Sequence, residues 1–307
     1  MQDGSKKAII AAFFANLGIA IAKFVGFAIT GSAGLLAEAG HSFADTGNQA
    51  LLLLGSKRGK RVADTTHPFG YGPERYFWAF VVALVLFSMG GLFAIYEGIS
   101  KVRHPHELDN AAVAVGILLF AIALETFSLT TAVRESNHIR DRSKSWWHFI
   151  RTTKSPELPV VLLEDMGAEI GLLFALSGIG LAHVTGDPRW DAVGSIAIGI
   201  LLVVIAIVVA IEMKALLIGE SPSDADQAAI CNALVTPNGI NGVIHMRAMH
   251  LGPEELLIAA KLDVDPSLDI AQLAAAIDQA EAALRSSISA KAMVYIEPDI
   301  RRDTTPQ

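Results

Sequence analysis

The sequence predicts an all-α transmembrane domain of six helices, followed by a small cytoplasmic α+β domain of the αββαβ, ferredoxin-like type. Two observations predict this fold class. Hydrophobic residues make up 52% of the 307-residue chain and charged residues only 18%, whereas soluble proteins carry about 25% charged residues. The apolar residues also gather into long stretches that end before Gly219. We therefore expect a six-helix transmembrane domain over residues 1–218 and a C-terminal domain over residues 219–307.

Six stretches reach the roughly 20 mostly apolar residues that a membrane span needs. They cover approximately Ala8–Thr30, Ala33–Leu54, Tyr76–Ser100, Ala111–Val133, Pro159–Val184 and Trp190–Leu217. Lys and Arg concentrate at the N-terminus and in the segments between spans two and three and between spans four and five. Since basic loops stay on the cytoplasmic side, we expect both termini in the cytoplasm.

The tail beyond Gly219 alternates between helical and strand patterns. Helical spacing of apolar residues predicts helices over Ala225–Val235 and Ala271–Leu284. Val243–His250 and Leu256–Val264 alternate like two strands across Gly252-Pro253, which predicts a hairpin. Ala292–Glu297 is predicted as a last strand. The resulting order is αββαβ, with helices on one face of a small sheet.

Charge and cysteine content exclude other classes of protein. The formal net charge is −7, which argues against a nucleic-acid partner because phosphate binding needs a basic surface. The single cysteine, Cys231, excludes a disulfide framework and a thiolate metal cluster within one chain. The lipid bilayer is therefore the first expected partner.

Ionisable residues inside the predicted spans are costly in lipid, so each one suggests a function. In the second span His41 and Asp45 stand four residues apart, and in the fifth Asp165 and Glu169 repeat this spacing, which places each pair on one helical face. Two such helices facing each other would supply one imidazole and three carboxylates. This four-coordinate set suits a divalent transition metal.

Other intramembrane charges allow more than one interpretation. Glu38 and Glu164, taken as lying near span ends, could simply reach the lipid headgroups. Lys23 could pair with Glu125 or extend its ammonium to the interface. Glu125 is the candidate for a proton relay.

The cytoplasmic connection after the second span contains Asp64-Thr-Thr-His67-Pro-Phe-Gly-Tyr71. Asp64 and His67 could bind a metal together. The same stretch could equally form a turn that docks the third span.

These residues together resemble the cation diffusion facilitator family of metal transporters over nearly the full chain. The strings that carry the resemblance are "GSAGLLAEAGHSFADTGNQALLLLG", "DTTHPFGYGPERYFWAF" and "VLLEDMGAEIGLL". "HSFADTGNQ" and "LLED" are most similar to the branch that includes the animal mitochondrial zinc transporter. The resemblance implies a homodimer, and it implies a transport site on spans two and five at His41, Asp45, Asp165 and Glu169.

Many zinc-transporting members have His then Asp on span five, where this chain has Asp165 and Glu169, so manganese, iron(II) or cobalt become candidates beside zinc.

The resemblance also implies two further metal sites. The family's loop site would fall on Asp64 and His67, with Tyr71 in the place of a further His. Its tail site would fall on His245 and Glu297, with His250 as an additional candidate. Lys261 and Tyr295 occupy positions where the family has His.

The sequence therefore predicts a secondary transporter and not an enzyme: an antiporter that exports a divalent cation, zinc first, against protons. The sequence contains no G-x-x-x-x-G-K loop, so ATP is not the expected energy source. An alternative is a non-transporting, metal-responsive membrane scaffold or partner subunit. The bacterial inner (plasma) membrane is the expected location, since we find no Arg-rich, acid-poor transit segment.

Overall fold

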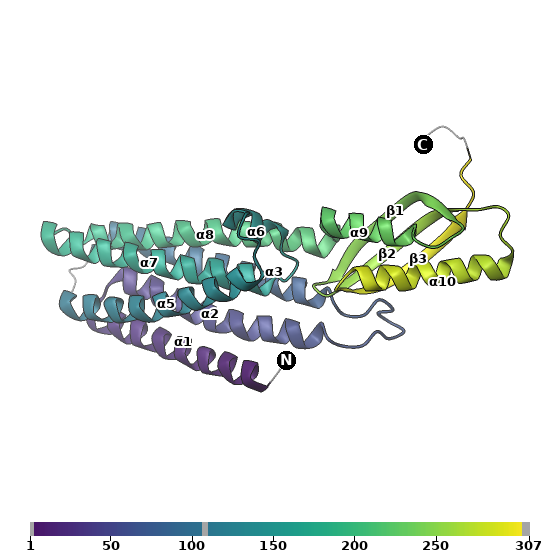
Figure 1. The fold of residues 1–307 in the computed structure, drawn as a ribbon. Helices are drawn as coiled ribbons and strands as arrows, with labels where there is room; N and C mark the ends of the chain where they lie inside the picture. Colours follow the sequence, from purple (N-terminus) through teal and green to yellow (C-terminus); the bar gives the residue numbers. More distant parts are fainter. Residues whose placement is uncertain (1–2, 106–109, 303–307) are drawn as a thin grey trace. The chain divides into compact units, whose positions relative to one another are not determined.

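The computed structural model describes residues 3–105 and 110–302 of the chain and divides it into two compact units (Figure 1). The first unit holds the chain up to Lys57 together with Arg75–Lys214. The second holds Arg58–Glu74 together with the chain from Ala215 onward. The connection after the second predicted span therefore groups with the tail and not with the helices that it joins.

The first unit is built of long helices that run alongside one another (Figure 1). Its elements are α1 (Asp3–Thr30), α2 (Ala33–Arg58), α3 (Glu74–Val85), η1 (Leu86–Leu92), α4 (Phe93–Arg103), α5 (Ala111–Ile139), α6 (Trp146–Thr152), α7 (Glu157–Thr185) and α8 (Arg189–Ile218). Helix α5 packs against both α7 and α1. The short helix α6 was not predicted; Ser145 caps it by accepting a hydrogen bond from the backbone N–H of His148.

Within the described residues, three helical stretches are long and apolar enough to cross a membrane. They are Glu74–Arg103, Ala111–Asn137 and Arg189–Ile218, and Asn16–Thr30 forms a shorter apolar helix. The second and fifth predicted spans form α2 and α7, which carry the polar residues of the predicted transport site. The number of six spans stays a prediction.

The third predicted span differs from an uninterrupted α-helix. Its centre, η1, is π-helical and is flanked by α3 and α4, a local widening that is often found at functional sites. Two glycines bring this region against α8. A Cβ on Gly91 would lie 2.6 Å from a Val203 side-chain carbon, and one on Gly199 would lie 2.7 Å from the Gly91 carbonyl oxygen. Small residues allow this close helix packing, as is common in membranes.

The tail has the predicted αββαβ order. Its elements are α9 (Asp224–Leu234), β1 (Ile240–Gly252), β2 (Glu255–Val264), α10 (Ile270–Ser287) and β3 (Lys291–Asp299). The strands form one sheet in the order β1-β2-β3. Strand β1 is antiparallel to β2, which confirms the predicted hairpin, and β3 is parallel to β2.

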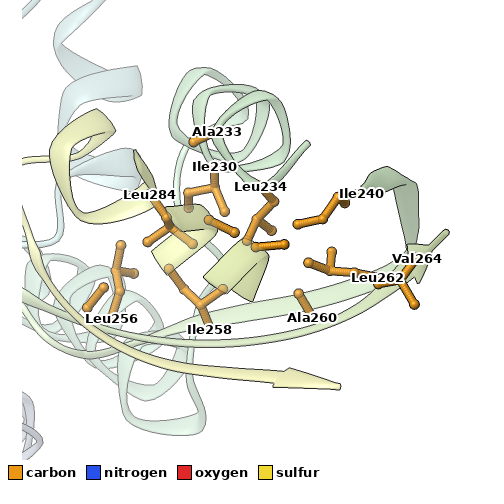
Figure 2. Close-up of a cluster of buried hydrophobic side chains, with 13 residues drawn as sticks. Ile230, Ala233, Leu234, Ile240, Leu256, Ile258, Ala260, Leu262, Val264 and Leu284 are labelled. Carbon is orange, nitrogen blue, oxygen red and sulfur yellow. The ribbon is translucent and has the colours of Figure 1, made fainter. Parts of the chain in front are cut away.

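The core of the tail lies between the sheet and its two helices (Figure 2). Ile258 and Leu262 of β2 belong to the same buried cluster as Ile230 of α9 and Leu284 of α10, and all four are fully buried. Alternate β2 residues fill this core because successive side chains of a strand face opposite sides. The tail is therefore an α/β domain with helices against one face of its sheet.

Candidate metal-binding sites

The first half of the predicted transport site lies on α2. His41 Nδ1 is 3.4 Å from Asp45 Oδ1, as their i, i+4 spacing requires. The His41 side chain is fully buried, and neither of its ring nitrogens has a hydrogen-bond partner among the described residues. Asp45 Oδ1 also lacks one in that part of the chain. Buried polar atoms are normally satisfied, so these groups are suited to accept a cation.

The second half lies on α7, where α5 holds both carboxylates. Ser128 Oγ donates to Asp165 Oδ2 at 2.9 Å, and Thr126 Oγ1 donates to Glu169 Oε1 at 3.0 Å. Glu169 Oε2 is buried and finds no hydrogen-bond partner within the residues that the structure describes. The two α7 acids therefore face hydroxyl groups of α5.

The four predicted ligands do not share one ligand sphere in this structure. Over residues 3–105 and 110–302, no group of three or more His, Cys, Asp or Glu side chains stands close enough to hold a metal ion. On α2, His41 and Asp45 lie beside each other, and on α7 both acids accept hydrogen bonds from hydroxyl groups of α5. The quartet His41, Asp45, Asp165 and Glu169 stays a prediction.

A direct polar link between α2 and α7 comes from residues that the sequence did not assign to the site. Asn48 Nδ2 donates to Glu164 Oε1 at 2.7 Å, and both side chains are buried. The interpretation that Glu164 reaches the headgroups is therefore wrong. Its sequence signal was the polar residue Asn48 in the second predicted span.

A second buried cluster joins α1, α2 and α5. Lys23 Nζ lies 3.0 Å from Glu38 Oε2, 2.7 Å from Ser42 Oγ and 3.9 Å from Glu125 Oε1. The Lys23 and Glu38 side chains are fully buried. Of the two interpretations of Lys23, pairing with Glu125 fits this geometry and extension to the interface does not. The headgroup interpretation of Glu38 is also wrong.

The loop residues Asp64 and His67 lie in a compact turn whose hydrogen bonds occupy the carboxylate. Asp64 Oδ2 accepts from the Tyr71 hydroxyl at 2.7 Å, and Oδ1 accepts from the backbone N–H groups of Thr66 and His67. Tyr71, followed by the His67 amide, holds the pKa of the Asp64 carboxyl below its ordinary value. His67 Nδ1 lies 3.8 Å from Asp64 Oδ1. The stretch forms a turn, as one interpretation expected, but this turn groups with the tail and not with the third predicted span.

Tyr71 anchors the same turn by its ring. The His67 ring lies against it at 4.3 Å between centroids, and the Arg61 guanidinium lies 4.1 Å from the Tyr71 centroid. One residue after Tyr71, Gly72 approaches the β1–β2 turn so closely that a Cβ would lie 2.3 Å from the Leu251 carbonyl oxygen. The loop is therefore docked on the tail hairpin.

Two predicted tail ligands, His245 and Glu297, lie near the ammonium group of Lys261. His245, Lys261 and Glu297 line one cavity of about 230 Å³. Lys261 Nζ is 3.0 Å from Glu297 Oε1 and 3.0 Å from Asp299 Oδ2. The hydrogen bonds that Lys261 donates to Glu297 and Asp299 raise its pKa above the ordinary value. An ammonium group therefore already balances the carboxylate that a metal would use.

His250, the additional tail candidate, belongs to different surroundings. It is 8% exposed, and its Nδ1 lies 3.3 Å from the Gly252 carbonyl oxygen. Its imidazole is thus engaged at the hairpin end. A tail metal site from His245, His250 and Glu297 stays a prediction.

A buried network at the start of α2 escaped sequence reasoning. Asp191 of α8 is fully buried and accepts from Ser32 Oγ at 2.6 Å and from the backbone N–H groups of Ala33 and Gly34. Lys101 Nζ of α4 lies 3.0 Å from its Oδ2. Asp191 therefore caps α2 from another helix. The available signal was an aspartate at the start of an apolar span.

Comparison with known proteins adds a family match and related sequences. The family model of the cation efflux transmembrane domain matches residues 9–218. The proton-coupled zinc antiporter SLC30A9, mitochondrial, of Xenopus laevis is 30% identical over 265 residues, which are 86% of this chain and 47% of that protein. The human protein of that name is 28% identical over 263 residues, 85% of this chain and 46% of its own length.

Two further similarities come from a plant and from solved structures. Metal tolerance protein C4 of Arabidopsis thaliana is 28% identical over 270 residues, 84% of this chain and 57% of that protein. This chain spans about half the length of the curated relatives that it matches. A solved MamM CTD is 28% identical and covers 26% of this chain and 94% of its own, with a TM-score of 0.24.

Proposed function

This chain belongs to the cation efflux family of transporters, and from that premise we propose that it exports a divalent metal cation in exchange for protons. The chain is a transporter rather than an enzyme. Zinc is the first expected cargo, because relatives of this chain are named proton-coupled zinc antiporters. Manganese, iron(II) and cobalt are the alternatives that an oxygen-rich ligand set allows.

The observation that carries this proposal is the buried His41–Asp45 pair of α2. Within the described residues, its two imidazole nitrogens and one carboxylate oxygen have no hydrogen-bond partner. Leaving buried polar groups unsatisfied costs about 1–3 kcal/mol each, so a site of this kind is retained where a ligand satisfies it. A divalent cation fits an imidazole beside a carboxylate.

Asp165 and Glu169 are the proposed remaining ligands on α7. Their contacts with Ser128 and Thr126 are hydrogen bonds from neutral hydroxyl groups at 2.9 and 3.0 Å. A divalent cation competes well with hydroxyl donors for carboxylate oxygens, so the two acids can exchange these partners for the cargo. The hydroxyl groups of α5 would then hold the acids in place between transport cycles.

Proton coupling follows from the chemistry of the proposed ligands. The imidazole must be neutral and the carboxylates ionised to bind metal, so protons and cargo compete for the same atoms. His41 is the member whose ordinary titration range lies near neutral pH. Glu125 is the proposed proton relay, since it stands on α5 directly before Thr126, which contacts Glu169.

The arrangement in the membrane is part of the same proposal. We place the transport domain at residues 1–218 with six spans, the cytoplasmic domain at residues 219–307, and both termini in the cytoplasm of a bacterial cell, in a homodimer. The excess of Lys and Arg in the connections between spans supports this orientation. Scanning accessibility of single cysteines introduced into these connections tests it.

Transport by purified protein in proteoliposomes tests the function. With an imposed pH gradient, wild-type protein should accumulate zinc, and Asp45→Ala and Asp165→Ala should each reduce uptake by at least about 100-fold, because each removes a charged ligand. Glu135→Gln, a change at an exposed acid of α5, should transport like wild type. Unimpaired uptake by either alanine variant contradicts the site assignment.

The scaffold alternative has one observation in its favour. Hydroxyl groups of α5 hold the α7 pair, and within the described part of the chain the α2 and α7 pairs form no shared cluster. Expression in a cell that lacks its zinc or manganese exporter separates the two functions. Rescue of metal resistance supports transport, whereas normal expression with persistent sensitivity supports the scaffold.

A further inference from the structure

Lys23 is a buried ammonium group in the apolar part of α1, beside the proposed transport site. Its side chain is fully buried. It donates to Glu38 Oε2 at 3.0 Å and to Ser42 Oγ at 2.7 Å, and Glu125 Oε1 lies 3.9 Å away. Such a group is costly in lipid, so its retention calls for a function.

The partners of Lys23 are neighbours of the proposed ligands on two helices. On α2, Ser42 directly follows His41, and Glu38 lies one turn before it. On α5, Glu125 directly precedes Thr126, whose hydroxyl holds Glu169 of α7. One ammonium group therefore reaches α2, which carries two proposed ligands, and α5, which holds the other two.

The charge of Lys23 acts on a region that is otherwise rich in acids. Glu38 and Glu125 share this ammonium group, and the proposed site adds three carboxylates. Charges interact strongly at low dielectric and are little screened by salt when buried. A fixed positive charge in this place offsets part of the negative field that attracts the cargo, which opposes overly tight binding.

We propose that Lys23 is a positioning residue whose fixed positive charge, held in place by Glu38, sets the affinity of the transport site for its divalent cargo. This inference rests on the proposed transport function. Lys23 binds no metal itself. It holds Ser42 and Glu125, and its charge lowers the affinity enough for the cation to leave during each cycle.

Three variants separate a role of charge from a role in packing. Lys23→Met removes a positive charge and should lower the KM for zinc in proteoliposomes roughly tenfold, with a lower maximal rate because release slows. Glu38→Gln removes a negative charge and should raise the KM by a similar factor. The double variant keeps the net charge and should return the KM to within about threefold of wild type.

Two controls complete the experiment. Lys23→Arg keeps the charge and should keep the wild-type KM. Lys101→Met removes another buried ammonium group, which pairs with Asp191, and should lower protein yield or maximal rate at an unchanged KM. If Lys23→Met does not fold, two results still test the role of Lys23: the higher KM expected for Glu38→Gln and the return of the KM toward wild type in the double variant.

The outcomes distinguish the two proposals. Wild-type transport with an unchanged KM in the Lys23 and Glu38 variants overturns the role of Lys23 and leaves the transport function standing. Equal losses of maximal rate in all three variants at constant KM also overturn it, because they indicate packing alone. Absence of metal uptake by wild-type protein overturns the transport function and, with it, this inference.

Discussion

Replacement of Asp191 by alanine should destabilise the helical unit by about 3–5 kcal/mol, because Asp191 is the acceptor of a fully buried network. Its carboxylate receives Ser32 Oγ at 2.6 Å, the Ala33 N–H at 2.7 Å and the Lys101 ammonium at 3.0 Å. Loss of a helix cap costs about 1 kcal/mol. Removing one partner of a buried ion pair costs about 3–5 kcal/mol and accounts for most of the loss, since the two effects are not additive.

The assay is thermal unfolding of the purified full chain in detergent, followed by tryptophan fluorescence at one fixed scan rate. At about 2–4 °C per kcal/mol for a unit of this size, Asp191→Ala should lower the Tm by roughly 10 °C. Asp278→Asn, at an exposed acid of α10, is the matched control and should change the Tm little. Asp191→Asn combined with Lys101→Met removes both charges and should recover part of the loss.

A small Tm change would refute this reasoning. If Asp191→Ala unfolds within about 1 °C of Asp278→Asn, the buried network does not hold the start of α2. If the double variant is less stable than Asp191→Ala, the unpaired charge of Lys101 is not the main cause of the loss. Either result would indicate that apolar packing, and not the buried network, accounts for the stability of this region.

Two further predictions concern the loop and the helix packing. Tyr71→Phe should raise hydrogen exchange of the backbone amides held by Asp64 severalfold in peptide-resolved mass spectrometry. The pKa of Asp64 is lowered from its ordinary value of 3.8. The contribution of its carboxylate to the stability of the turn is therefore present above that pH and is lost only as the pH falls through the lowered value. Unchanged exchange in Tyr71→Phe would contradict the role of the Tyr71 hydroxyl. Gly199→Ala should lower the Tm by several degrees because its Cβ would lie 2.7 Å from the Gly91 carbonyl oxygen, whereas Gly180→Ala, whose Cβ would meet nothing within 4 Å among the described residues, should not. Equal Tm values for these two variants would argue against close packing of α8 on η1.

Much of the fold was predictable because its helices and strands follow from the pattern of apolar residues among sequence neighbours. Apolar runs predicted the long helices, and alternation across Gly252-Pro253 predicted the hairpin that β1 and β2 form. The π-helical centre of the third predicted span was not predictable from hydropathy, which is equally high in α and π segments. The short helix α6 also escaped prediction, since a helix of seven residues leaves too few turns for a periodic pattern.

The candidate site was predictable in its residue types and less so in its contacts. The i, i+4 spacing correctly placed His41 beside Asp45. It could not reveal that Asp165 meets Ser128 of α5, because the rotation of α7 about its axis is set by packing. The sequence resemblance named Asp64 as a loop ligand, yet Tyr71 occupies one of its carboxylate oxygens.

The sequence was sufficient to place this chain in the cation efflux family and to predict its apolar helices, its small α/β tail and the few acids beside one histidine within the predicted spans. Hydropathy and helical periodicity are local properties, and they depend only on neighbouring residues. The tertiary structure alone decided which buried charges pair. Lys23 meets Glu38 fifteen residues away, and Asp191 meets Ser32 at a separation of 159 residues. The packing of whole helices determines such pairs. Burying a charge is costly unless an opposite charge or a hydrogen-bonding group lies beside it, and which groups lie beside it depends on residues far apart in the sequence.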